Sequence, residues 1–461
     1  MSASASPNRS LGTMRVDGSR RMLHPLMVMG RWLKRRIVGF VVLTAVYVIA
    51  PFIQVRGHPL LFLDVQHRAF WLAGFSFNAQ DVWLVALLAL AAGFGLLFVT
   101  AWRGRVWCGW FCPQTVFLEA VFRPIERFFD GPREHRLKLQ GLKWSAARVV
   151  RLVGKYIAYL VAATAVAHAM AAIFVSPVEL LAMLREGPAA HLEAFTLITS
   201  FSALLVFNFA WFREQFCVVM CPYGRLQSVL HDSRTVTVAY DARRGEPRGS
   251  LKSATPVGDC VDCNKCVQAC PTGIDIRNGL QMECIACLQC VDACDDVMKR
   301  VKRPEGLIRF ASMKELAGTK LSTLRPRLVV YGLLFVLSSS AFGAGLFTRV
   351  PFEANVLRPR GGNPFVVDGA MVRNAFEVHL VNKHSEMAVF EIDVSAPVAA
   401  EISVGTPRVG LGALQDLRVS VAVAIERRWL GRPVTLDLQI RDLTSGDVEH
   451  VAVRFLGPPS P

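Results

Sequence analysis

Eight of the twelve cysteines lie close together and have a spacing that suits iron–sulfur chemistry. They form two runs, each with the pattern C-x2-C-x2-C-x3-C. In a two-cluster segment of this kind, three thiolates of one run and the last thiolate of the other run hold each cluster. The sequence therefore predicts two [4Fe–4S] clusters with crossed ligation. The expected ligands are Cys260, Cys263, Cys266 and Cys294 for one cluster, and Cys284, Cys287, Cys290 and Cys270 for the other.

Zinc binding and disulfides are the alternatives for these eight cysteines. Zinc sites usually pair two cysteines across a gap, and we expect this loop to face a reducing compartment, so both alternatives are weak. Pro271 follows the first run, as in bacterial two-cluster ferredoxins, whereas Asp295 follows the second. This departure changes a turn and removes no ligand.

The other four cysteines form two copies of the motif C-x3-C-P, at Cys108 and Cys112 and at Cys217 and Cys221. Each copy directly follows an apolar segment, so the chain from the first to the fourth apolar segment resembles a repeated unit in parallel orientation. Such a repeat would gather four thiols at one membrane surface. Clustered thiolates favour Cu(I), zinc or cycling between dithiol and disulfide, and the residues alone do not choose among these.

Five apolar segments are long enough to span a bilayer, which takes about 17–25 residues each. They lie near residues 37–54, 82–101, 155–175, 194–212 and 328–347. The composition agrees, because 52% of the residues are hydrophobic and only 19% are charged, which argues against a soluble enzyme or a disordered chain. We therefore expect a multi-pass α-helical membrane protein.

The excess of 52 Lys and Arg over 36 Asp and Glu is concentrated in alternate loops. Because basic loops stay in the cytoplasm, this pattern places the N-terminus inside and the C-terminus outside. It also explains the net charge of +16 through membrane orientation, so we expect no nucleic-acid partner. The first segment is read as a retained anchor, since no cleavage site of a signal peptide precedes it.

Five regions follow from these patterns. We expect a basic cytoplasmic tail at 1–36 and a four-helix membrane domain at 37–212 that contains both C-x3-C-P motifs. We expect a cytoplasmic domain at 213–327 to follow, with a ferredoxin-type segment at about 250–300. A fifth transmembrane helix at 328–347 should then lead to a periplasmic domain at 348–461. In the last region hydrophobic residues alternate with period two, between turn residues. Six or seven short strands in this length predict an immunoglobulin-like β-sandwich.

The whole layout resembles the CcoG/FixG (RdxA/RdxB) family of cytochrome oxidase accessory proteins, which are membrane polyferredoxins. The matching segments are WCGWFCPQTVFLEAVFRPIER, FCVVMCPYGRLQSVL, the ferredoxin segment from Cys260 to Cys294, and VRNAFEVHLVNKH in the expected sandwich. The resemblance covers about residues 30–455 and is specific because all these parts occur together. It implies a protein of the bacterial inner membrane that acts in the assembly of a cbb-type oxidase.

The same resemblance implies that the protein is a cupric reductase, with Cys108, Cys112, Cys217 and Cys221 as the copper-handling thiols. The implied partners are oxidase subunits or a copper chaperone or transporter, an unknown cytoplasmic electron donor, and the lipid bilayer; a homodimer is left open. Two other readings compete with this one. The chain could be a quinol-linked polyferredoxin that passes electrons between the quinone pool and a redox partner, or a scaffold whose sandwich docks oxidase subunits.

Two further features carry weaker expectations. His168 lies inside the third apolar segment, where an ionisable residue is a candidate ligand or proton carrier, although a backbone carbonyl can also satisfy it. Arg123, Glu126 and Arg127 follow the first C-x3-C-P motif, and we expect them to be solvated or to contact lipid headgroups.

Overall fold

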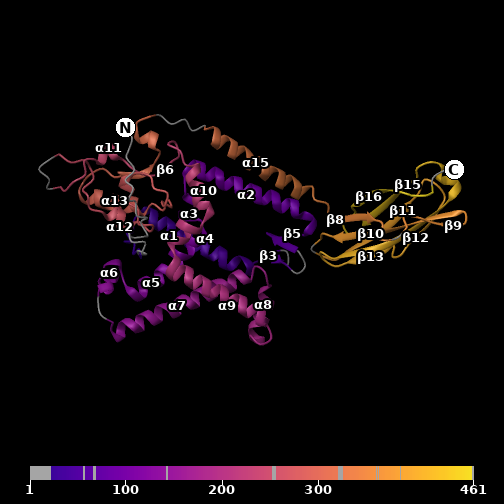
Figure 1. Cartoon of the computed structure of the whole chain (residues 1–461), viewed down its shortest axis with the longest axis horizontal. Coiled ribbons are helices and arrows are strands. Elements are labelled where there is room, and N and C mark those ends of the chain that lie inside the picture. The colour runs from indigo at the N-terminus through magenta and orange to yellow at the C-terminus, as the bar shows by residue number, and fades with distance from the viewer. Residues whose placement is uncertain are drawn as a thin grey trace. The chain divides into compact units, whose positions relative to one another are not determined.

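The computed structural model describes residues 22–458 except 56–57, 66–68, 142–143, 252–255, 320–324, 360, 362 and 385. Residues 1–21 of the expected basic tail thus lie outside the described residues. The chain divides into two compact units, one made of Met1–Gln54 and Leu87–Ser340 and the other of Val55–Ala86 and Ala341–Pro461. Figure 1 labels their helices and strands.

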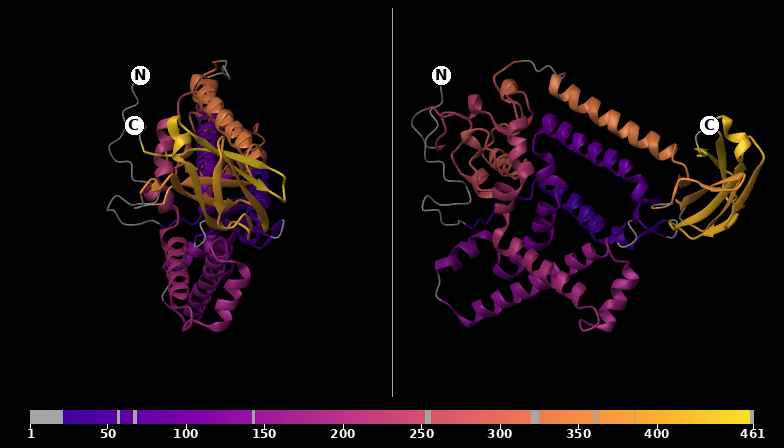
Figure 2. Two further views of the ribbon diagram at one scale, coloured as in Figure 1. Left: turned by 90° about the vertical axis from the view of Figure 1, so that its right-hand side faces the viewer. Right: turned by 45° about the vertical axis from the view of Figure 1, so that its right-hand side comes forward.

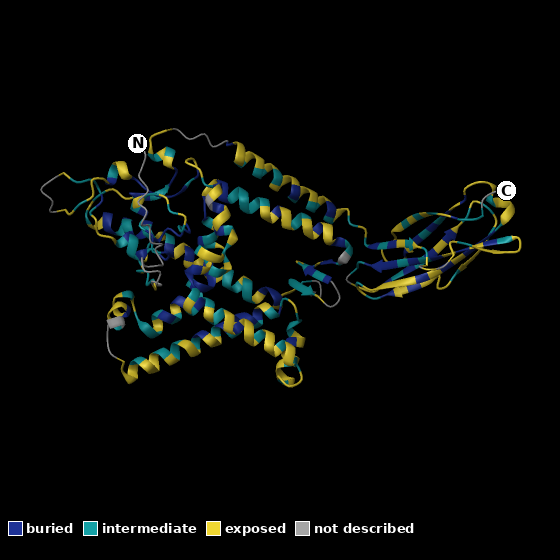
Figure 3. Ribbon diagram, in the orientation of Figure 1, coloured by how far each residue is buried: buried dark blue, intermediate teal, exposed yellow. Residues whose placement is uncertain are grey.

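Among the described residues, five helices are long and apolar enough to cross a membrane. They are α1 (Arg31–Ile49) with the short η1 (Ala50–Phe52), α2 (Val82–Arg103), α7 (Ala146–Ala171), α9 (Leu192–Val206) with the π-helical η4 (Phe207–Phe212), and α15 (Pro326–Phe347). Only 11–17% of the residues in their most apolar windows are buried inside the protein. Figure 3 shows the resulting exposed faces, for example on α7 and α15. Because these faces are apolar, they suit lipid, and the predicted membrane protein with five helices is confirmed.

Two helix pairs organise the first unit. Tyr159 and Val166 of α7 pack with Phe209 of η4 and with aromatic residues that follow the first C-x3-C-P motif. In the second pair, Gly95 of α2 faces the ring of Phe335 of α15, and Gly332 of α15 faces the ring of Phe98. The two views of Figure 2 show α2 and α15 running alongside each other.

Short elements connect the long helices and carry the cysteines. The first C-x3-C-P region contains α3 (Val106–Trp110), α4 (Pro113–Phe117), η3 (Leu118–Phe122), α5 (Arg123–Asp130) and α6 (Arg133–Gly141). The second region contains η5 (Phe216–Met220) and α10 (Pro222–Leu230). Between the two regions, α8 (Pro177–Glu186) joins α7 to α9. The cysteine-rich segment contains β6 (Thr237–Tyr240), α11 (Ala242–Gly245), α12 (Lys265–Ala269), η6 (Ile276–Asn278), α13 (Gln289–Arg300), β7 (Ile308–Ala311) and α14 (Met313–Leu316). The antiparallel pair β6 and β7 brackets both cysteine runs and so closes this segment into one lobe.

The second unit holds a small sheet of β3 (Leu61–Asp64), β4 (Ala69–Leu72) and β5 (Phe75–Phe77), next to η2 (Ala79–Asp81). The chain between α1 and this sheet forms β1 (Gln54–Val55) and β2 (His58–Pro59). In this unit Arg349, just after α15, donates to the buried carboxylate of Asp81 at 2.6 Å. This ion pair ties the start of α2 to the chain that enters the sandwich.

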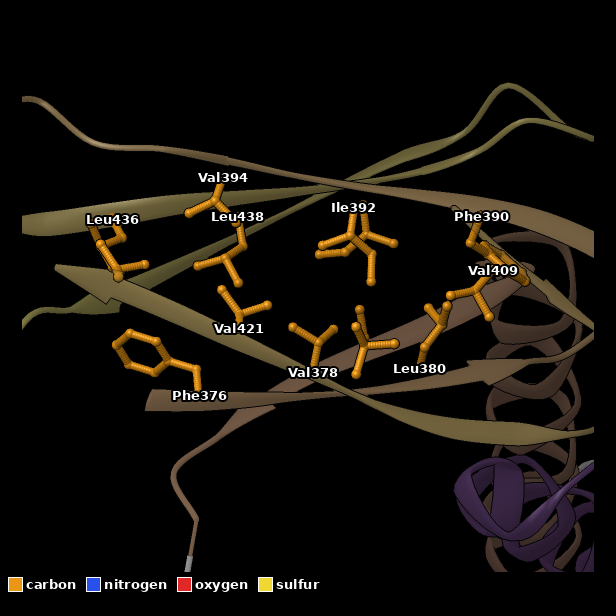
Figure 4. Packing of buried hydrophobic residues seen from close by; sticks show 14 of the residues in the cluster. Phe376, Val378, Leu380, Phe390, Ile392, Val394, Val409, Val421, Leu436 and Leu438 are labelled. Carbon is orange, nitrogen blue, oxygen red and sulfur yellow. The ribbon is translucent and has the colours of Figure 1, made fainter. Parts of the chain in front are cut away.

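The C-terminal part is the predicted immunoglobulin-like sandwich. One sheet has the order β12–β14–β10–β8 with β9 also on β10, and the other has the order β13–β11–β15–β16. The strands are β8 (Phe352–Leu357), β9 (Val366–Asp368), β10 (Met371–Asn382), β11 (Ala388–Ser395), β12 (Ala400–Val404), β13 (Arg408–Leu411), β14 (Asp416–Glu426), β15 (Thr435–Asp442) and β16 (Val448–Arg454), with the 3-10 turn η7 (Arg427–Gly431). Figure 4 shows Phe376, Val378 and Leu380 of one sheet facing Ile392 and Leu438 of the other.

In the described part of the sandwich nine strands form, where the alternation predicted six or seven. The five runs with clear alternation are β10, β11, β14, β15 and β16, each long enough to show the pattern. The additional strands are short, and β9 is exposed at all three of its residues. A strand with no buried face leaves no period-two signal in the sequence, because alternation arises only where one face is buried.

Candidate iron–sulfur and thiol site

The two cysteine runs adopt the same unusual backbone. In each run the residues directly before and after the second cysteine have positive φ: Asp262 (52°) and Asn264 (56°) in the first, Ala286 (51°) and Leu288 (62°) in the second. None of the four is glycine. Asp262 and Asn264 tolerate this left-handed conformation, whereas Ala286 and Leu288 adopt it only where their surroundings hold them. The same backbone at equivalent positions shows that the two loops share one local structure. The short helices α12 and α13 begin directly after these loops.

The fold sorts the eight cysteines into two small, nearly apolar cavities. Cys260, Cys263, Cys266 and Cys294 line one of them. Cys270, Cys284, Cys287 and Cys290 line the other, which Cys266 also borders. Each cavity thus receives three thiols from one run and the last thiol from the other, which is the arrangement that crossed ligation requires.

These residues fit [4Fe–4S] clusters in their chemistry as well. Burial raises the pKa of Cys266, Cys284 and Cys294 to about 12, so these thiols would not ionise at neutral pH without a nearby positive charge. Bound iron supplies that charge. Among the described residues, no three His, Cys, Asp or Glu side chains are grouped closely enough to hold a single metal ion. The observation that favours a cluster is that each cavity is lined by thiols from both cysteine runs.

Asp295 has a structural role at the position where Pro is usual. Its carboxylate accepts a hydrogen bond from the backbone N–H of Gly306 at 3.0 Å and lies 3.8 Å from the guanidinium of Arg31. Because burial raises the pKa of Asp295, the ionised carboxylate depends on these two partners for its stability. The neighbouring Asp292 receives the backbone N–H groups of Trp32 and Leu33, so α13 also caps the first transmembrane helix.

The four remaining cysteines occupy matching places in their motifs. Cys108 lies in α3 and Cys217 in η5, whereas Cys112 and Cys221 are the N-cap residues of α4 and α10. In both motifs the proline takes the first helical position, where its missing N–H costs no hydrogen bond. The repeated C-P pair therefore sets the same loop-to-helix turn twice.

The structure brings these four thiols together. Burial first, and then the nearby cysteines, raise the pKa of Cys108 to about 12, although Arg105 lowers it. The pKa of Cys217 is raised for the same reasons, and Cys112, Cys108 and Cys221 all contribute. Burial raises the pKa of Cys112 as well, with Cys221 again contributing. The four thiols are thus partly buried within electrostatic range of one another, although no three of them are grouped closely enough among the described residues to hold one metal ion.

Direct contacts lock the two motifs together. Arg105, before the first motif, donates to the carbonyl oxygen of Gly224, after the second. The thiol of Cys108 donates to the side-chain oxygen of Gln227 at 3.4 Å. Within the second motif, Gly224 packs so closely on the preceding turn that a Cβ there would lie 2.8 Å from the carbonyl oxygen of Cys217. The pairing of the motifs is therefore built into the fold.

The first motif also packs directly on the second cysteine run. A Cβ at Gly109 would lie 2.3 Å from the carbonyl oxygen of Ile285 and 3.2 Å from the backbone nitrogen of Cys287. The indole N–H of Trp110 donates to the carbonyl oxygen of Ala286 at 3.2 Å, and Arg36 donates to the carbonyl oxygen of Gly109 at 3.1 Å. Residues 284–287 and the Cys108 motif are consequently in backbone contact.

A buried network of charges connects the two motif regions, and the sequence did not predict it. Arg213 donates to Glu126 at 2.6 Å, Arg136 approaches the same carboxylate at 3.1 Å, and Arg123 pairs with Glu119 at 2.6 Å and with Glu214. All but Glu119 are buried. The expectation that Arg123 and Glu126 are solvated was therefore wrong.

The ion pairs of this network stabilise the charged forms of both its carboxylates and its guanidinium groups. Burial opposes the ionisation of Glu126, but Arg213 and Arg136 outweigh it and lower its pKa to about 2. Burial likewise opposes the charge on Arg213, and Glu126 and Glu214 raise its pKa above the ordinary value. Because Arg213 and Glu214 stand just before Cys217, and Glu126 follows Cys112, the network joins the two motif regions.

His168 and Met220 do not join the thiols in this arrangement. Met220 is 62% exposed. His168 lines a different, apolar cavity of about 310 Å³ between α7, α8 and α9, and its Nδ1 lies 2.8 Å from the carbonyl oxygen of Thr164. A backbone carbonyl thus satisfies one ring nitrogen of His168.

Comparison with known families gives three matches. A 4Fe–4S dicluster domain matches residues 212–313, and a 4Fe–4S binding domain matches residues 84–132. The immunoglobulin-like fold found at the C-terminus of FixG matches residues 342–458. Two 4Fe–4S binding domains and the C-terminal sandwich are therefore present.

Three curated relatives are similar over most of their length. The chain is 34% identical to protein RdxB of Cereibacter sphaeroides, over 85% of each chain. It is 33% identical to the nitrogen fixation protein FixG of Rhizobium meliloti, over 88% of this chain and 84% of FixG. Protein RdxA of Cereibacter sphaeroides is 34% identical, over 78% of this chain and 79% of RdxA.

Proposed function

The chain belongs to the FixG/RdxA family of membrane iron–sulfur electron-transfer proteins, and from this premise we propose that it reduces Cu(II) to Cu(I) for a cbb-type oxidase. The proposed copper site consists of the four C-x3-C-P thiols, Cys108, Cys112, Cys217 and Cys221, which must draw closer around an ion, because no three of them are grouped closely enough to hold one in the described structure. Soft thiolates bind Cu(I) strongly, whereas Cu(II) oxidises thiols unless another electron source is close by.

One observation carries the proposal: the Cys108 motif is in backbone contact with the second cysteine run. The close approach of Gly109 to Ile285 and the bond from Trp110 to Ala286 hold the thiols next to the residues that would bind a cluster. Each Cu(II) ion takes up one electron when it is reduced to Cu(I). A bound [4Fe–4S] cluster can supply this electron, and a soluble one-electron donor must then reduce the cluster again. The thiols hold the ion during this transfer.

Copper K-edge spectroscopy on the anaerobic, cluster-reduced chain tests this proposal. After Cu(II) is added, we expect the edge of Cu(I) and a first coordination shell of sulfur only. A first shell of nitrogen or oxygen, or an unchanged Cu(II) edge, would place copper elsewhere and reject the proposed site.

We also propose that crossed ligation holds the two clusters, as the two cavities suggest. Cys270→Ser is then expected to damage the cluster on Cys284, Cys287 and Cys290, although Cys270 belongs to the first run. Iron content should fall from about eight to about four per chain, and one of two cubane EPR signals should remain. Cys263→Ser should remove the opposite signal. Loss of the same signal in both variants would show that each run binds its own cluster.

Gly109→Ala tests whether the contact between motif and cysteine run matters. The added Cβ has no room, so either Ile285 or the motif must move, at a cost of about 1–3 kcal/mol. We expect a lower melting temperature and slower reoxidation of the reduced clusters by Cu(II). Gly39→Ala in α1 is the matched control, because a Cβ at Gly39 meets nothing within 4 Å and alanine suits a helix. Equal rates in the two variants would mean that the contact is dispensable.

The location proposed for the protein is the bacterial inner membrane, with the N-terminus and the cysteine-rich segment in the cytoplasm and the sandwich in the periplasm. The alternation of basic loops supports this orientation. Reporter fusions at about residues 140 and 260 should be active in the cytoplasm, and fusions at about residues 70, 185 and 400 in the periplasm. A periplasmic signal at 260 would contradict the orientation.

The proposed partners follow from this orientation. A soluble electron donor would meet the cysteine-rich segment, where Cys263 is exposed. Oxidase subunits, or a copper chaperone or transporter, would receive Cu(I), and the periplasmic sandwich offers a surface on which such a partner could dock. A scaffold role alone would leave the paired thiols without a use.

A second candidate, a quinol-linked polyferredoxin, is favoured by one observation. The apolar cavity between α7, α8 and α9 contains His168, whose Nδ1–H donates to a backbone carbonyl and whose Nε2 is then an acceptor that could receive the hydroxyl of a quinol. The cavity lies at the C-terminal end of α7, whereas the thiols lie near the opposite membrane surface in the proposed orientation. We therefore rank copper reduction first.

A further inference from the structure

Arg36 of α1 is a completely buried charge at the junction of the first motif and the cysteine runs. Its exposed fraction is 0%, and its Nε donates to the carbonyl oxygen of Gly109 at 3.1 Å. The amide of Gln289 bridges two partners: its nitrogen donates to the carbonyl oxygen of Ala269 at 2.8 Å, and its oxygen accepts from Nη1 of Arg36 at 2.8 Å. One guanidinium thus joins the first motif to the second cysteine run and, through Gln289, to the end of the first run.

These contacts place Arg36 beside one of the two cysteine-lined cavities. Gln289 directly precedes Cys290, and Ala269 directly precedes Cys270. Both of these cysteines line the cavity that receives the second cysteine run. The backbone that positions two of its thiols is therefore held by the side chain that also holds the first motif.

No contact among the described residues neutralises the charge of Arg36. Its hydrogen-bond partners are a carbonyl oxygen and an amide oxygen, the ring of Phe40 lies 4.7 Å from its Cζ, and its Nη2 has no partner. Burial raises the pKa of Cys287, and Arg36 is the strongest influence that lowers it. Glu119 acts on Cys287 in the opposite sense but more weakly, and it is paired with Arg123 at 2.6 Å. A fixed positive charge thus acts on the cavity of the second run.

The cavity of the first run has a different electrostatic environment. Arg277 lines this cavity, but its guanidinium is bonded to Asp275 at 2.7 Å and to Asp262 at 2.5 Å. Burial raises the pKa of Cys266 in this cavity; Arg277 lowers it, and Asp275 raises it again. A buried cation with neutral partners therefore adjoins one cavity, whereas the cation at the other is paired with two carboxylates.

We propose that Arg36 raises the reduction potential of the cluster held by the second cysteine run above that of the cluster held by the first run. Reduction by the soluble one-electron donor adds one electron, and so one negative charge, without making or breaking a bond. A buried cation stabilises this added charge more strongly than a cation in water does, and charge near a cluster is one of the factors that set its potential. The electron would then come to rest on the cluster beside the first motif. This inference rests on the two bound clusters, but neither on their fourth ligands nor on copper as the acceptor.

A redox titration of the anaerobic full-length chain, followed by EPR, tests the proposal. The signal lost in Cys284→Ser identifies the second-run cluster, and the signal lost in Cys263→Ser identifies the first-run cluster. In the wild type we expect the second-run cluster to be reduced first. In Arg36→Gln the equilibrium constant for its reduction should fall about tenfold, which lowers the potential of a one-electron couple by about 59 mV. The potential of the first-run cluster should change less.

Two further variants separate the charge of Arg36 from its structural contacts. Arg36→Lys keeps the charge and should keep a potential close to that of the wild type. Arg35→Gln is the matched control, because it removes an exposed charge from the adjacent position of α1 and should shift the potential little. The order of reduction in the wild type needs no substitution at Arg36, so it tests the proposal even where Arg36→Gln loses iron.

Three results would overturn the proposal. Earlier reduction of the first-run cluster in the wild type would show that the second-run cluster does not have the higher potential. Equal shifts in Arg36→Gln and Arg35→Gln would show that burial of the charge does not matter. An equal shift in Arg36→Lys and Arg36→Gln would show that the contacts of the guanidinium, rather than its charge, set the potential. A chain with the expected order that does not reduce Cu(II) would reject the copper site and leave this proposal intact.

Discussion

A chain in which Cys108, Cys112, Cys217 and Cys221 are all serine is expected to keep its iron and to lose copper reduction. The serines preserve the shape of the two motifs, and the four positions are separate from the two cysteine-lined cavities. Hydroxyl groups are poor ligands for Cu(I). Removal of residues that contact only the metal ligands already lowers metal affinity about 10–100-fold. Removal of all four thiol ligands should therefore lower the affinity for Cu(I) still further.

The measurement is the rate at which Cu(II) reoxidises the reduced clusters, with iron analysis and EPR on the same samples. Met220→Leu is the control, because this soft sulfur lies between two of the thiols but points to the exterior. If the four-serine chain reoxidises at the wild-type rate, copper is reduced elsewhere. If it loses iron, the C-x3-C-P thiols contribute to cluster binding.

Glu126→Gln is expected to have the largest effect on stability of any single substitution outside the cysteines. The glutamine leaves Arg213 and Arg136 buried without a compensating charge, and breaking a buried ion pair in this way costs about 3–5 kcal/mol. Because the network joins the regions before Cys217 and after Cys112, we also expect slower copper reduction. Thermal unfolding in detergent measures the first effect, and exposed Glu134→Gln in α6 is the control.

The effect of Glu126 should depend on pH. Its pKa is lowered to about 2 in the folded chain, so its contribution to stability is fully present above the ordinary pKa of a glutamate and is lost as the pH falls towards 2. The difference in melting temperature between wild type and Glu126→Gln should therefore be constant near neutral pH and shrink below about pH 4. A difference that stays constant down to pH 3 would mean that the charge of Glu126 is not what stabilises the fold.

The sequence was most informative where chemistry or periodicity leaves a local pattern. The five apolar segments, the long alternating strands and the cysteine spacings are all such patterns, and the fold class predicted from them is correct. These patterns did not predict short strands such as β9, which has no buried face and therefore no alternation.

Contacts between distant segments could not be predicted in the same way. Arg213 and Glu126 are 87 residues apart, and nothing local distinguishes them from charges that face water. Trp110 and Ala286 are 176 residues apart, so the contact between the first motif and the second cysteine run was equally hidden. The one available signal was Gly109 itself, a glycine between a cysteine and a tryptophan, whose missing side chain leaves room for the loop at Ile285.

Copper reduction at the paired thiols can be tested most directly by giving the cluster-reduced chain one acceptor at a time. Stopped-flow absorbance would follow cluster reoxidation after anaerobic mixing with Cu(II) or with a quinone, with a Cu(I)-specific chelator counting the product. We predict rapid reoxidation by Cu(II), with one Cu(I) formed for each electron lost, and slow reoxidation by the quinone. Rapid reoxidation by the quinone, with clusters that stay reduced in Cu(II), would contradict copper reduction and identify the quinone as the acceptor.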